Sequence, residues 1–506
     1  MKKYIKSSWR LLLALSILFT ISGCKKYLER QPLTATLDDI KQGGIEGLVF
    51  GLYGSARGYG SPGEAFSGLH WHALHNIRSD DSEKGSYAAD QADMLVIFDR
   101  FQYSKDFWLS NGYWDGHYSL IHLANTAIQT ADSLKLESVD SKANIAEARF
   151  FRAFAYFDLV RVFGEVPKID FRLYNAGQAN VPKKKVDTIY ALIDADLQYA
   201  TANLPLTWGN KYPGRLTSGA ARTLWAKAYL YRGNFTAALP LCQQVISSGQ
   251  YSLFSSYYGI FKETGENSSE SILEWQNYMG PNQTDDYGSW YSTVQGVRGS
   301  NASGWNLGWG FNVPTDAFVN SFEAGDPRKA STVLFSGQSD DPATGGYGKT
   351  LPNWEGAIPA GTMFCKYYNK KVYGDPAVHQ STGWLDGSYW INQRVYRYAD
   401  VLLMTAECLN ETGGGALAAP LVNQVRARVQ LPIISYTTQA DMRTAIKKER
   451  RSELGLEGER FFDLVRWGDA ISVLGTLGYT NRCRYYPIPQ GAIDKSNNVL
   501  VQNPEW

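Results

Sequence analysis

Residues 447–468 read KKERRSELGLEGERFFDLVRWG, and this stretch decides the fold class. Before it, Thr438 and Asp441 fit a helix N-terminal cap, and apolar side chains then recur at three- and four-residue spacing. Glu449 and Glu453 continue the same face, so that this helix face ends in two carboxylates. Buried carboxylates need cationic partners. Nearby candidates are Arg450, Arg451, Arg460 and Arg466.

Gly455 and Gly458 end this helix, and a second apolar segment follows. The pentapeptide FDLVR occurs there at Phe462–Arg466 and again at Phe157–Arg161, at the end of another apolar helix. An Asp and an Arg in such surroundings indicate fixed polar contacts inside a core. The repeat therefore predicts a large, mostly α-helical body with core-facing helices.

The overall composition limits the kinds of partner and core that this protein can have. The 506 residues carry 50 basic and 49 acidic side chains, a net charge of +1. This balance gives no electrostatic case for nucleic acid as a partner. Aromatic residues make up 14% of the chain, including 15 Trp and 32 Tyr. They predict an aromatic-rich core, a ligand-facing aromatic surface, or both.

The N-terminus carries an export signal. Basic residues precede an apolar run from Leu11 to Ile21, which is the pattern of a signal peptide and too short for a comfortable membrane span. Gly23-Cys24 follows and looks like a bacterial lipobox, which implies cleavage after residue 23 and lipid attachment at Cys24. The alternative is an ordinary signal peptide beside a chance cysteine. Cys242 and Cys408 sit in helical patterns and are predicted to be small buried groups, with no disulfide expected.

The mature chain divides into two regions, 24–263 and 264–506. Helix hairpins are predicted at 217–251 and 396–432. Residues 264–395 are rich in Gly, Asn, Ser, Asp and aromatics and predict a loop-rich insertion, whereas 396–506 is helical again. Glycines from Gly47 to Gly58 recur every three or four residues and predict a helix face that another backbone approaches closely.

Five ordered blocks of sequence resemble the SusD/RagB family. The first block quoted above matches its C-terminal signature, ERRxELxxEGxRFFDLxRWG. Ala146–Pro167, RYADVLLMTAECLN from Arg397 and the YPIP and QNP motifs near the end also match, although Glu505-Trp506 replaces the usual Gly-Tyr. The resemblance implies a SusD-like helical scaffold with tetratricopeptide-like hairpins. It also implies a non-catalytic lipoprotein of the outer-membrane surface, which captures nutrients for a SusC-like TonB-dependent transporter.

No enzyme motif is found. The sequence has no GxSxG nucleophile elbow, and ATGGYGKT at 343–350 lacks the first glycine of a P-loop. Glu449 and Glu453 are interpreted as structural ion pairs rather than an acid/base pair. His70, His72 and His75 form a metal-like cluster, but their spacing fits neither one helix face nor one strand face, so no metal or other cofactor is predicted. Loop acids at 285–286 and 340–341 could hold calcium, although such residues are usually only solvated.

The predicted ligand is an oligosaccharide or polysaccharide. A sugar ring presents C–H groups that suit an aromatic face, and its hydroxyls suit Asp, Asn and Arg. In the family, the loop before the helix that starts near Trp114 supplies an aromatic platform and a polar partner, and the resemblance assigns these to Trp108 and Asn111. The remaining candidates are the acceptors Asp80 and Asp81, and the aromatics Trp290, Tyr291, Trp305 and Trp309. Each Trp could instead be a packing residue.

Two other functions stay open. A peptide-capturing member of the same family would have a cleft that fits extended backbone instead of flat aromatic platforms. A surface glycoside hydrolase would need two carboxylates about 5–10 Å apart across a cleft, and the sequence indicates no such pair.

Overall fold

The computed structural model describes residues 44–506 except 58–62, 210–211, 279–287, 289, 301–302, 355–361 and 382–388. The predicted signal peptide and Cys24 lie outside this part of the chain. Helices dominate the described residues, and their short strands pair into two-stranded antiparallel sheets. The predicted mostly α-helical class is therefore confirmed.

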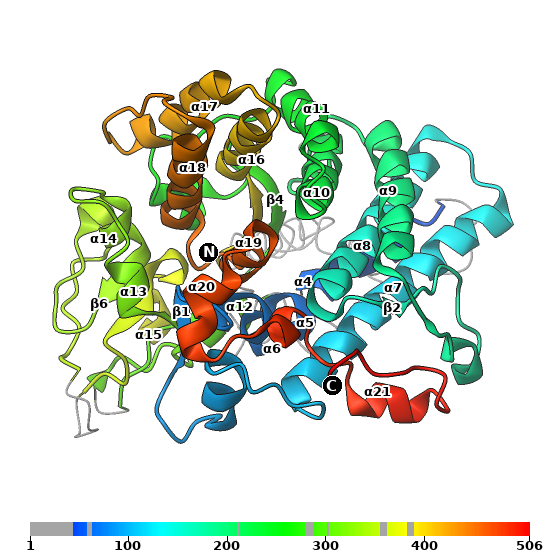
Figure 1. The fold of residues 1–506 in the computed structure, drawn as a ribbon, viewed down its shortest axis with the longest axis horizontal. Helices are drawn as coiled ribbons and strands as arrows, with labels where there is room; N and C mark the ends of the chain where they lie inside the picture. The colour runs from blue at the N-terminus through cyan, green and yellow to red at the C-terminus, as the bar shows by residue number, and fades with distance from the viewer. Residues whose placement is uncertain are drawn as a thin grey trace, which may run out of the picture.

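Long antiparallel helices form an arch (Figure 1). Each helix packs on the next: α7 on α8, α8 on α9, α9 on α10, α10 on α11, α11 on α16, and α16 on α17 and α18. Their bounds are α7 Trp108–Leu134, α8 Val139–Phe163, α9 Val186–Asn203, α10 Ser218–Tyr231, α11 Phe235–Ser247, α16 Tyr398–Glu411, α17 Gly415–Arg428 and α18 Gln439–Leu454. Both predicted hairpins are thus present, as α10–α11 and α16–α17. Cys242 and Cys408 are buried within them, as predicted.

Helix α8 lies at the centre of the arch and is buried on nearly every side. Phe154 contacts the rings of Phe66, Trp275 and Tyr396, which come from distant parts of the chain. The helix ends at Gly164, where φ is +75° and a Cβ would meet the Tyr485 ring at 3.1 Å, so glycine is favoured by both backbone and space. The prediction of a core-facing helix that ends near the first FDLVR pentapeptide is confirmed.

The stretch quoted first folds as α18, then α19 (Arg460–Trp467). Thr438 caps α18 by accepting the backbone N–H of Asp441 at 3.1 Å. Gly468 ends α19 with φ +78°, a conformation that favours glycine.

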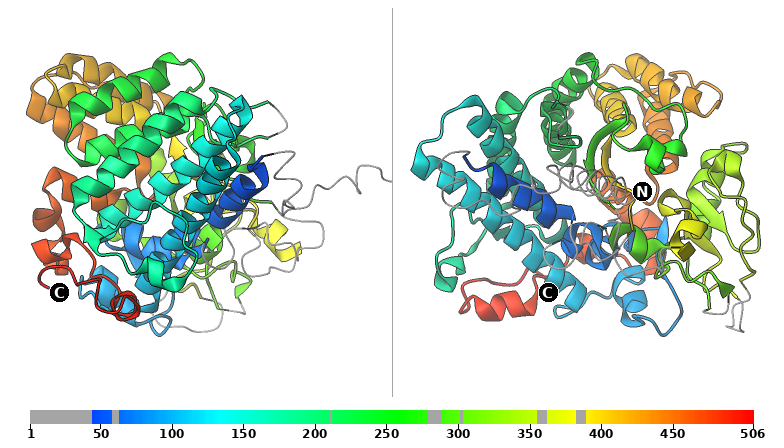
Figure 2. Two further views of the ribbon diagram at one scale, coloured as in Figure 1. Left: turned by 90° about the vertical axis from the view of Figure 1, so that its right-hand side faces the viewer. Right: turned by 180° about the vertical axis from the view of Figure 1, so that it is seen from behind.

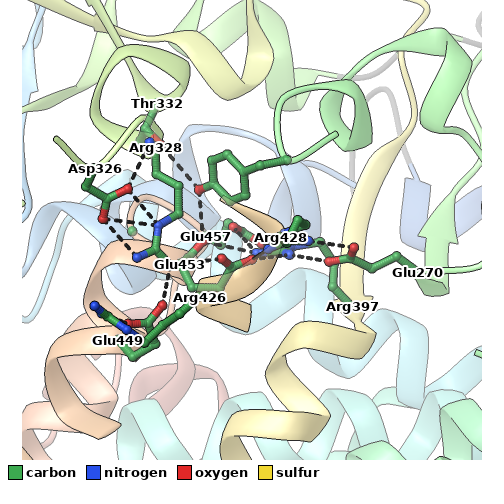
Figure 3. A network of polar contacts seen from close by, with 12 residues as sticks. Glu270, Asp326, Arg328, Thr332, Arg397, Arg426, Arg428, Glu449, Glu453 and Glu457 are labelled. Carbon is green, nitrogen blue, oxygen red and sulfur yellow. Dashed lines mark hydrogen bonds and ion pairs between the residues drawn. The ribbon is translucent and has the colours of Figure 1, made fainter. Parts of the chain in front are cut away.

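The carboxylates of α18 lie inside a buried ion network (Figure 3). Glu453 accepts from Arg397 at 2.9 Å and from Arg428 at 2.5 Å. Arg328, which comes from the insertion, donates to Glu449 at 2.6 Å and to Glu453 at 3.2 Å. The interpretation of Glu449 and Glu453 as structural ion pairs is confirmed, and the network joins the insertion to the helical body.

The insertion carries most of the strands. Strand β4 (Ser271–Trp275) pairs with β8 (Gln393–Arg397), β6 (Val333–Phe335) with β7 (Tyr367–Asn369), and β1 (Ser82–Gly85) with β5 (Phe311–Pro314). Near α8, β2 (Val166–Pro167) pairs with β3 (Lys183–Lys184). The β1–β5 pairing holds residues 82–100 against the insertion, as the views from the side and from behind also show (Figure 2). The remaining helices are α4 Glu46–Arg57, α5 Glu64–Ser67, α6 Leu69–His72, α12 Trp290–Gln295, α13 Asp316–Val319, α14 Arg328–Thr332, α15 Pro376–Ser381, α20 Ala470–Leu474 and α21 Gln490–Lys495.

One prediction about α4 is wrong. Gly51 and Gly54 are exposed, and a Cβ at either position would meet nothing within 4 Å. Their spacing places them on the solvent face of the helix rather than against another backbone. Among the described helices, none combines the length and apolar character needed to cross a membrane.

Candidate functional site

A turn at residues 86–91, directly after β1, holds two tryptophans in place. The Oε1 atom of Gln91 accepts a hydrogen bond from Trp108 Nε1 at 3.3 Å. The neighbouring Asp90 carboxylate pairs with the Arg298 guanidinium, which also donates to the backbone oxygen of Trp309 at 3.2 Å. The turn therefore connects Trp108 of the helical body to Trp309 of the insertion.

Trp108 is the first residue of α7, so the helix begins earlier than the sequence predicted and Trp108 does not lie in a loop before it. Trp108 is 46% exposed, as a ligand-facing ring requires. The His70 ring lies edge-on to it at a centroid distance of 5.1 Å, and Gln91 satisfies the indole N–H. Because the polar atom is satisfied while much of the ring stays exposed, the ring can stack on a ligand without losing a hydrogen bond. Asn111 is half-buried, its amide donates to Asp106 at 3.1 Å, and its Oδ1 atom has no hydrogen-bond partner among the described residues.

A cavity of about 470 Å³ is lined by residues 83–88, which include the start of this turn. Trp354, which is 45% exposed, lines it together with Leu95. Its other aromatic lining residues are Tyr87, Phe364 and Tyr367, and its charged ones are Glu83, Lys84, Asp316 and Lys366. Aromatic faces beside carboxylates and ammonium groups are suited to a ligand with C–H faces and hydroxyls.

Two of the predicted platform residues are wrong. Trp290 and Tyr291 are only 8% and 9% exposed, because α12 packs against α5 and α6 in the interior. Trp290 lies against Trp309 at a centroid distance of 4.6 Å, and Tyr291 lies against His72 at 5.0 Å. Both rings are packing residues and present little surface to a ligand.

Trp305 and Trp309 are half-buried. Trp305 packs against the small core of the insertion, and Trp309 against the main core. Each keeps part of its surface exposed, so both stay candidates for ligand contact.

The prediction that Asp80 and Asp81 accept hydroxyls from a ligand is also wrong. Asp80 pairs with Arg460 at 2.8 Å and with Arg451 at 2.7 Å, and Asp81 pairs with Arg451 at 2.6 Å. Burial acts to raise the pKa of Asp80, but the two guanidiniums outweigh burial and lower that pKa below its usual value. These ion pairs fasten the segment before β1 to α18 and α19. Sequence alone could not pair residues some 370 positions apart.

The histidine cluster has separate structural roles. His70 lies beside Trp108, His72 accepts a hydrogen bond from the Asn76 amide at 3.2 Å, and His75 exchanges one with the Tyr113 hydroxyl at 2.8 Å. No group of three or more His, Cys, Asp or Glu side chains in the described part of the chain could hold a metal ion.

Of the two acidic loop pairs considered for calcium, only the pair at 340–341 lies among the described residues. Asp340 is buried and accepts backbone and tyrosine hydrogen bonds, so it closes a turn instead of facing solvent. The acids at 285–286 lie outside the described residues.

Comparisons with known proteins agree with the family resemblance seen in the sequence. A family model described as "SusD family" matches residues 269–481, which include α18 and α19. A second, described as "Starch-binding associating with outer membrane", matches residues 74–230, which include Trp108. The chain belongs to the SusD/RagB family. The two matches together span both the helical arch and the insertion, so the SusD-like assignment covers the candidate site as well as the scaffold.

Individual SusD-like relatives agree over most of their length. SusD-like protein P2 of Formosa agariphila is 29% identical over 428 residues, which cover 80% of this chain and 82% of the relative. The starch-binding protein SusD of Bacteroides thetaiotaomicron is 24% identical, with 70% and 71% covered. Among solved structures, a laminarin-binding SusD-like protein has a TM-score of 0.75 at 27% identity, covering 91% of this chain and 99% of that one.

Several residues of this SusD-like site were missed from sequence. Trp354 follows Leu-Pro-Asn and precedes Glu-Gly, and a lone tryptophan between turn-forming residues is a usable signal for an exposed ring. Arg298 carries no such signal, because it pairs with Asp90 across some 200 residues, and Gln91 is an ordinary loop residue whose contact with Trp108 depends on how the loop folds. The turn at 86–91 is predictable as a loop, but its contacts are not.

Proposed function

We propose that this SusD-like protein is a surface lipoprotein that captures oligosaccharides or polysaccharides and passes them to a SusC-like TonB-dependent transporter. The observation that carries the proposal is the pair of exposed rings, Trp108 and Trp354, each of which lies beside residues of the segment 86–95. Proteins similar to this chain include a starch-binding and a laminarin-binding protein, which supports a glycan as the ligand class.

The physical case rests on the surface between these rings. A neutral glycan can stack a sugar face on an exposed indole and keep its hydroxyls hydrogen-bonded to nearby polar groups. Trp108 offers such a face, with the amide of Gln91 beside it. Trp354 offers a second, with Glu83 and Asp316 in the same cavity. A chain several sugars long would contact both rings, whereas a single sugar would contact one.

The proposed location follows from the sequence and the family. Lipid attachment at Cys24 would tether the protein to the outer membrane, with the described body outside the lipid. A matching family model is described as associating with the outer membrane, which supports this part of the proposal. Transfer to a transporter is inferred from the family resemblance.

Peptide capture is the first alternative, and the exposed aromatic rings argue against it. An extended peptide would be expected to add to a free strand edge or to fill side-chain pockets along a cleft. The cavity at Trp354 instead combines flat aromatic rings with a few polar groups, which is the pattern suited to sugars.

One observation favours glycoside hydrolysis as a second candidate function. Glu83 and Asp316 line the same cavity. Burial and the nearby Asp316 raise the pKa of Glu83, whereas hydrogen bonds from Lys366 and Tyr367 lower the pKa of Asp316. Opposite pKa shifts are one requirement of a glycosidase acid and its partner, and a separation of about 5–10 Å across the bound sugar is the other.

One screen tests both functions. The purified protein is run through gels that contain laminarin, starch or another polysaccharide, and any retarding glycan is then titrated by calorimetry. We expect retardation by at least one glycan without release of reducing ends. Failure of every glycan in a broad panel would contradict glycan capture. Release of reducing ends that stops in Glu83→Gln would establish hydrolysis instead.

A further inference from the structure

A second cavity of about 440 Å³ lies away from the candidate glycan site. Its walls are α7, the segment 167–181 that follows β2, and the C-terminal residues 492–500. Figure 1 shows α21 and the segment after β2 on the same side of the molecule as α7. The main apolar lining residues are Trp114, Tyr118, Ile121, Ile169, Leu173 and Leu500.

The size and lining of this cavity are those of a small-molecule site. Pockets that bind small ligands commonly measure about 300–1,000 Å³ and are mostly apolar, with few polar groups that orient the ligand. The polar or charged side chains here are Asp115, His122, Asn180, Lys495 and Ser496. The aromatic rings of Trp114, Tyr118 and His122 all come from one helix and form one wall.

His122 has an unmet hydrogen-bonding capacity. Its Nδ1 atom is buried and has no hydrogen-bond partner among the described residues. Burial and the nearby Arg172 lower the pKa of His122, which keeps the imidazole neutral near pH 7. Because Nδ1 is closed off from solvent, a ligand in the cavity would hydrogen-bond with the other ring nitrogen, Nε2, which is not buried.

The charges of the lining do not favour an ionic ligand. Asp115 and Lys495 line the cavity with opposite charges, and Lys495 lowers the pKa of Asp115 against the larger, raising effect of burial. The two charges largely offset each other, so neither a carboxylate nor an ammonium group gains a clear electrostatic advantage. A neutral polar group avoids the cost of desolvating a charge.

We propose that this cavity binds a small, neutral amphipathic molecule. Its apolar ring or chain lies among Tyr118, Leu173 and Val181, which are partly exposed in the cavity, and its hydroxyl or amide group hydrogen-bonds with His122. This site is separate from the glycan site at Trp108 and Trp354, so it does not depend on the proposed function.

Three probes with the same ring system test the proposal: 2-naphthol, 2-naphthoate and naphthalene. Each is titrated by calorimetry into purified protein that carries Cys24→Ala, so that no attached acyl chain competes. We expect saturable one-to-one binding of 2-naphthol. Naphthoate and naphthalene should bind at least about tenfold more weakly. His122→Phe should remove the advantage of 2-naphthol over naphthalene.

Matched variants locate the binding. Ala179→Trp fills the cavity from its edge and should weaken 2-naphthol binding at least about tenfold, whereas Ala202→Trp, at an exposed position on α9, should not change it. Melting temperatures check that both variants fold, and Ala492→Leu replaces Ala179→Trp if that variant does not. Tighter binding of naphthoate, an absence of saturable binding by all three probes, or binding that survives cavity filling would each overturn the proposal.

Discussion

The guanidinium of Arg397 donates to the carboxylate of Glu453 at 2.9 Å in the protein interior, where each side chain is at most 1% exposed. Arg397 ends β8 and Glu453 lies in the last turn of α18, so the contact joins the insertion's last strand to the C-terminal helices. Arg328 and Arg428 also contact the same carboxylate. Removing Glu453 would therefore take one carboxylate partner from each of three buried cations.

Glu453→Gln should destabilise the protein by about 3–5 kcal/mol, the usual cost of breaking a buried ion pair from one side. Glu137→Gln is the matched control, because Glu137 is exposed and its replacement should cost less than about 0.5 kcal/mol. Chemical denaturation of both variants measures the difference. Equal stabilities would mean that the network of Figure 3 contributes little.

The same network predicts acid sensitivity. Burial acts to raise the pKa of Glu453, but Arg428, Arg397 and Arg328 outweigh it and hold that pKa well below its usual range. A carboxyl whose folded pKa is lowered stabilises the protein fully above its unfolded pKa of about 4.3, and this stability is lost as pH falls through the folded pKa. The melting temperature should therefore drop from about pH 5 to about pH 3, and less steeply in Glu453→Gln. Parallel curves for parent and variant would rule out this carboxyl as a source of the acid sensitivity.

The sequence predicted the scaffold better than the site. The helix that holds Glu453 was predicted from local periodicity and a cap at Thr438, both of which depend on neighbouring residues. Trp290 looked like Trp108 in sequence, an aromatic beside polar residues, but it is buried because α12 packs on helices more than 200 residues earlier. Asp80 failed as a ligand contact for the same reason, since its partner Arg460 lies far along the chain.

Phe154→Ala tests the centre of the helical arch. The ring is 6% exposed and contacts four other aromatic rings, so its loss should leave a cavity and cost about 3–5 kcal/mol. Phe171→Ala, where 39% of the residue is exposed, is the control and should cost far less. Thermal melting compares them. Similar melting temperatures for the two variants would show that α8 is peripheral to stability.

Cys24→Ala should release the protein from the membrane, because the lipid would have no thiol to attach to. In labelling with radioactive palmitate, the parent should carry label and the variant none, and the variant should move to the soluble fraction. Ser22→Ala exchanges one small residue for another just before the site and should keep the label. Label that persists in Cys24→Ala would contradict lipid attachment at this residue.

The glycan site makes the sharpest prediction, because Trp108, Trp354 and Trp290 differ in exposure. Trp108 and Trp354 are 46% and 45% exposed, so replacing either with Ala should weaken glycan binding about tenfold and leave the melting temperature near that of the parent. Trp290 is 8% exposed, so Trp290→Ala should cost about 3–5 kcal/mol of stability. Calorimetric titration with a glycan found by the gel screen, paired with thermal melting, separates the two effects.

The length of the glycan provides a second test of the same site. If one glycan contacts both rings, short oligosaccharides should be sensitive to one of the two substitutions and long ones to both. Trp354→Ala that binds long glycans as tightly as the parent would remove the cavity at Trp354 from the site. Trp108→Ala that melts far below the parent would instead make Trp108 a packing residue, against its exposure and its satisfied indole N–H.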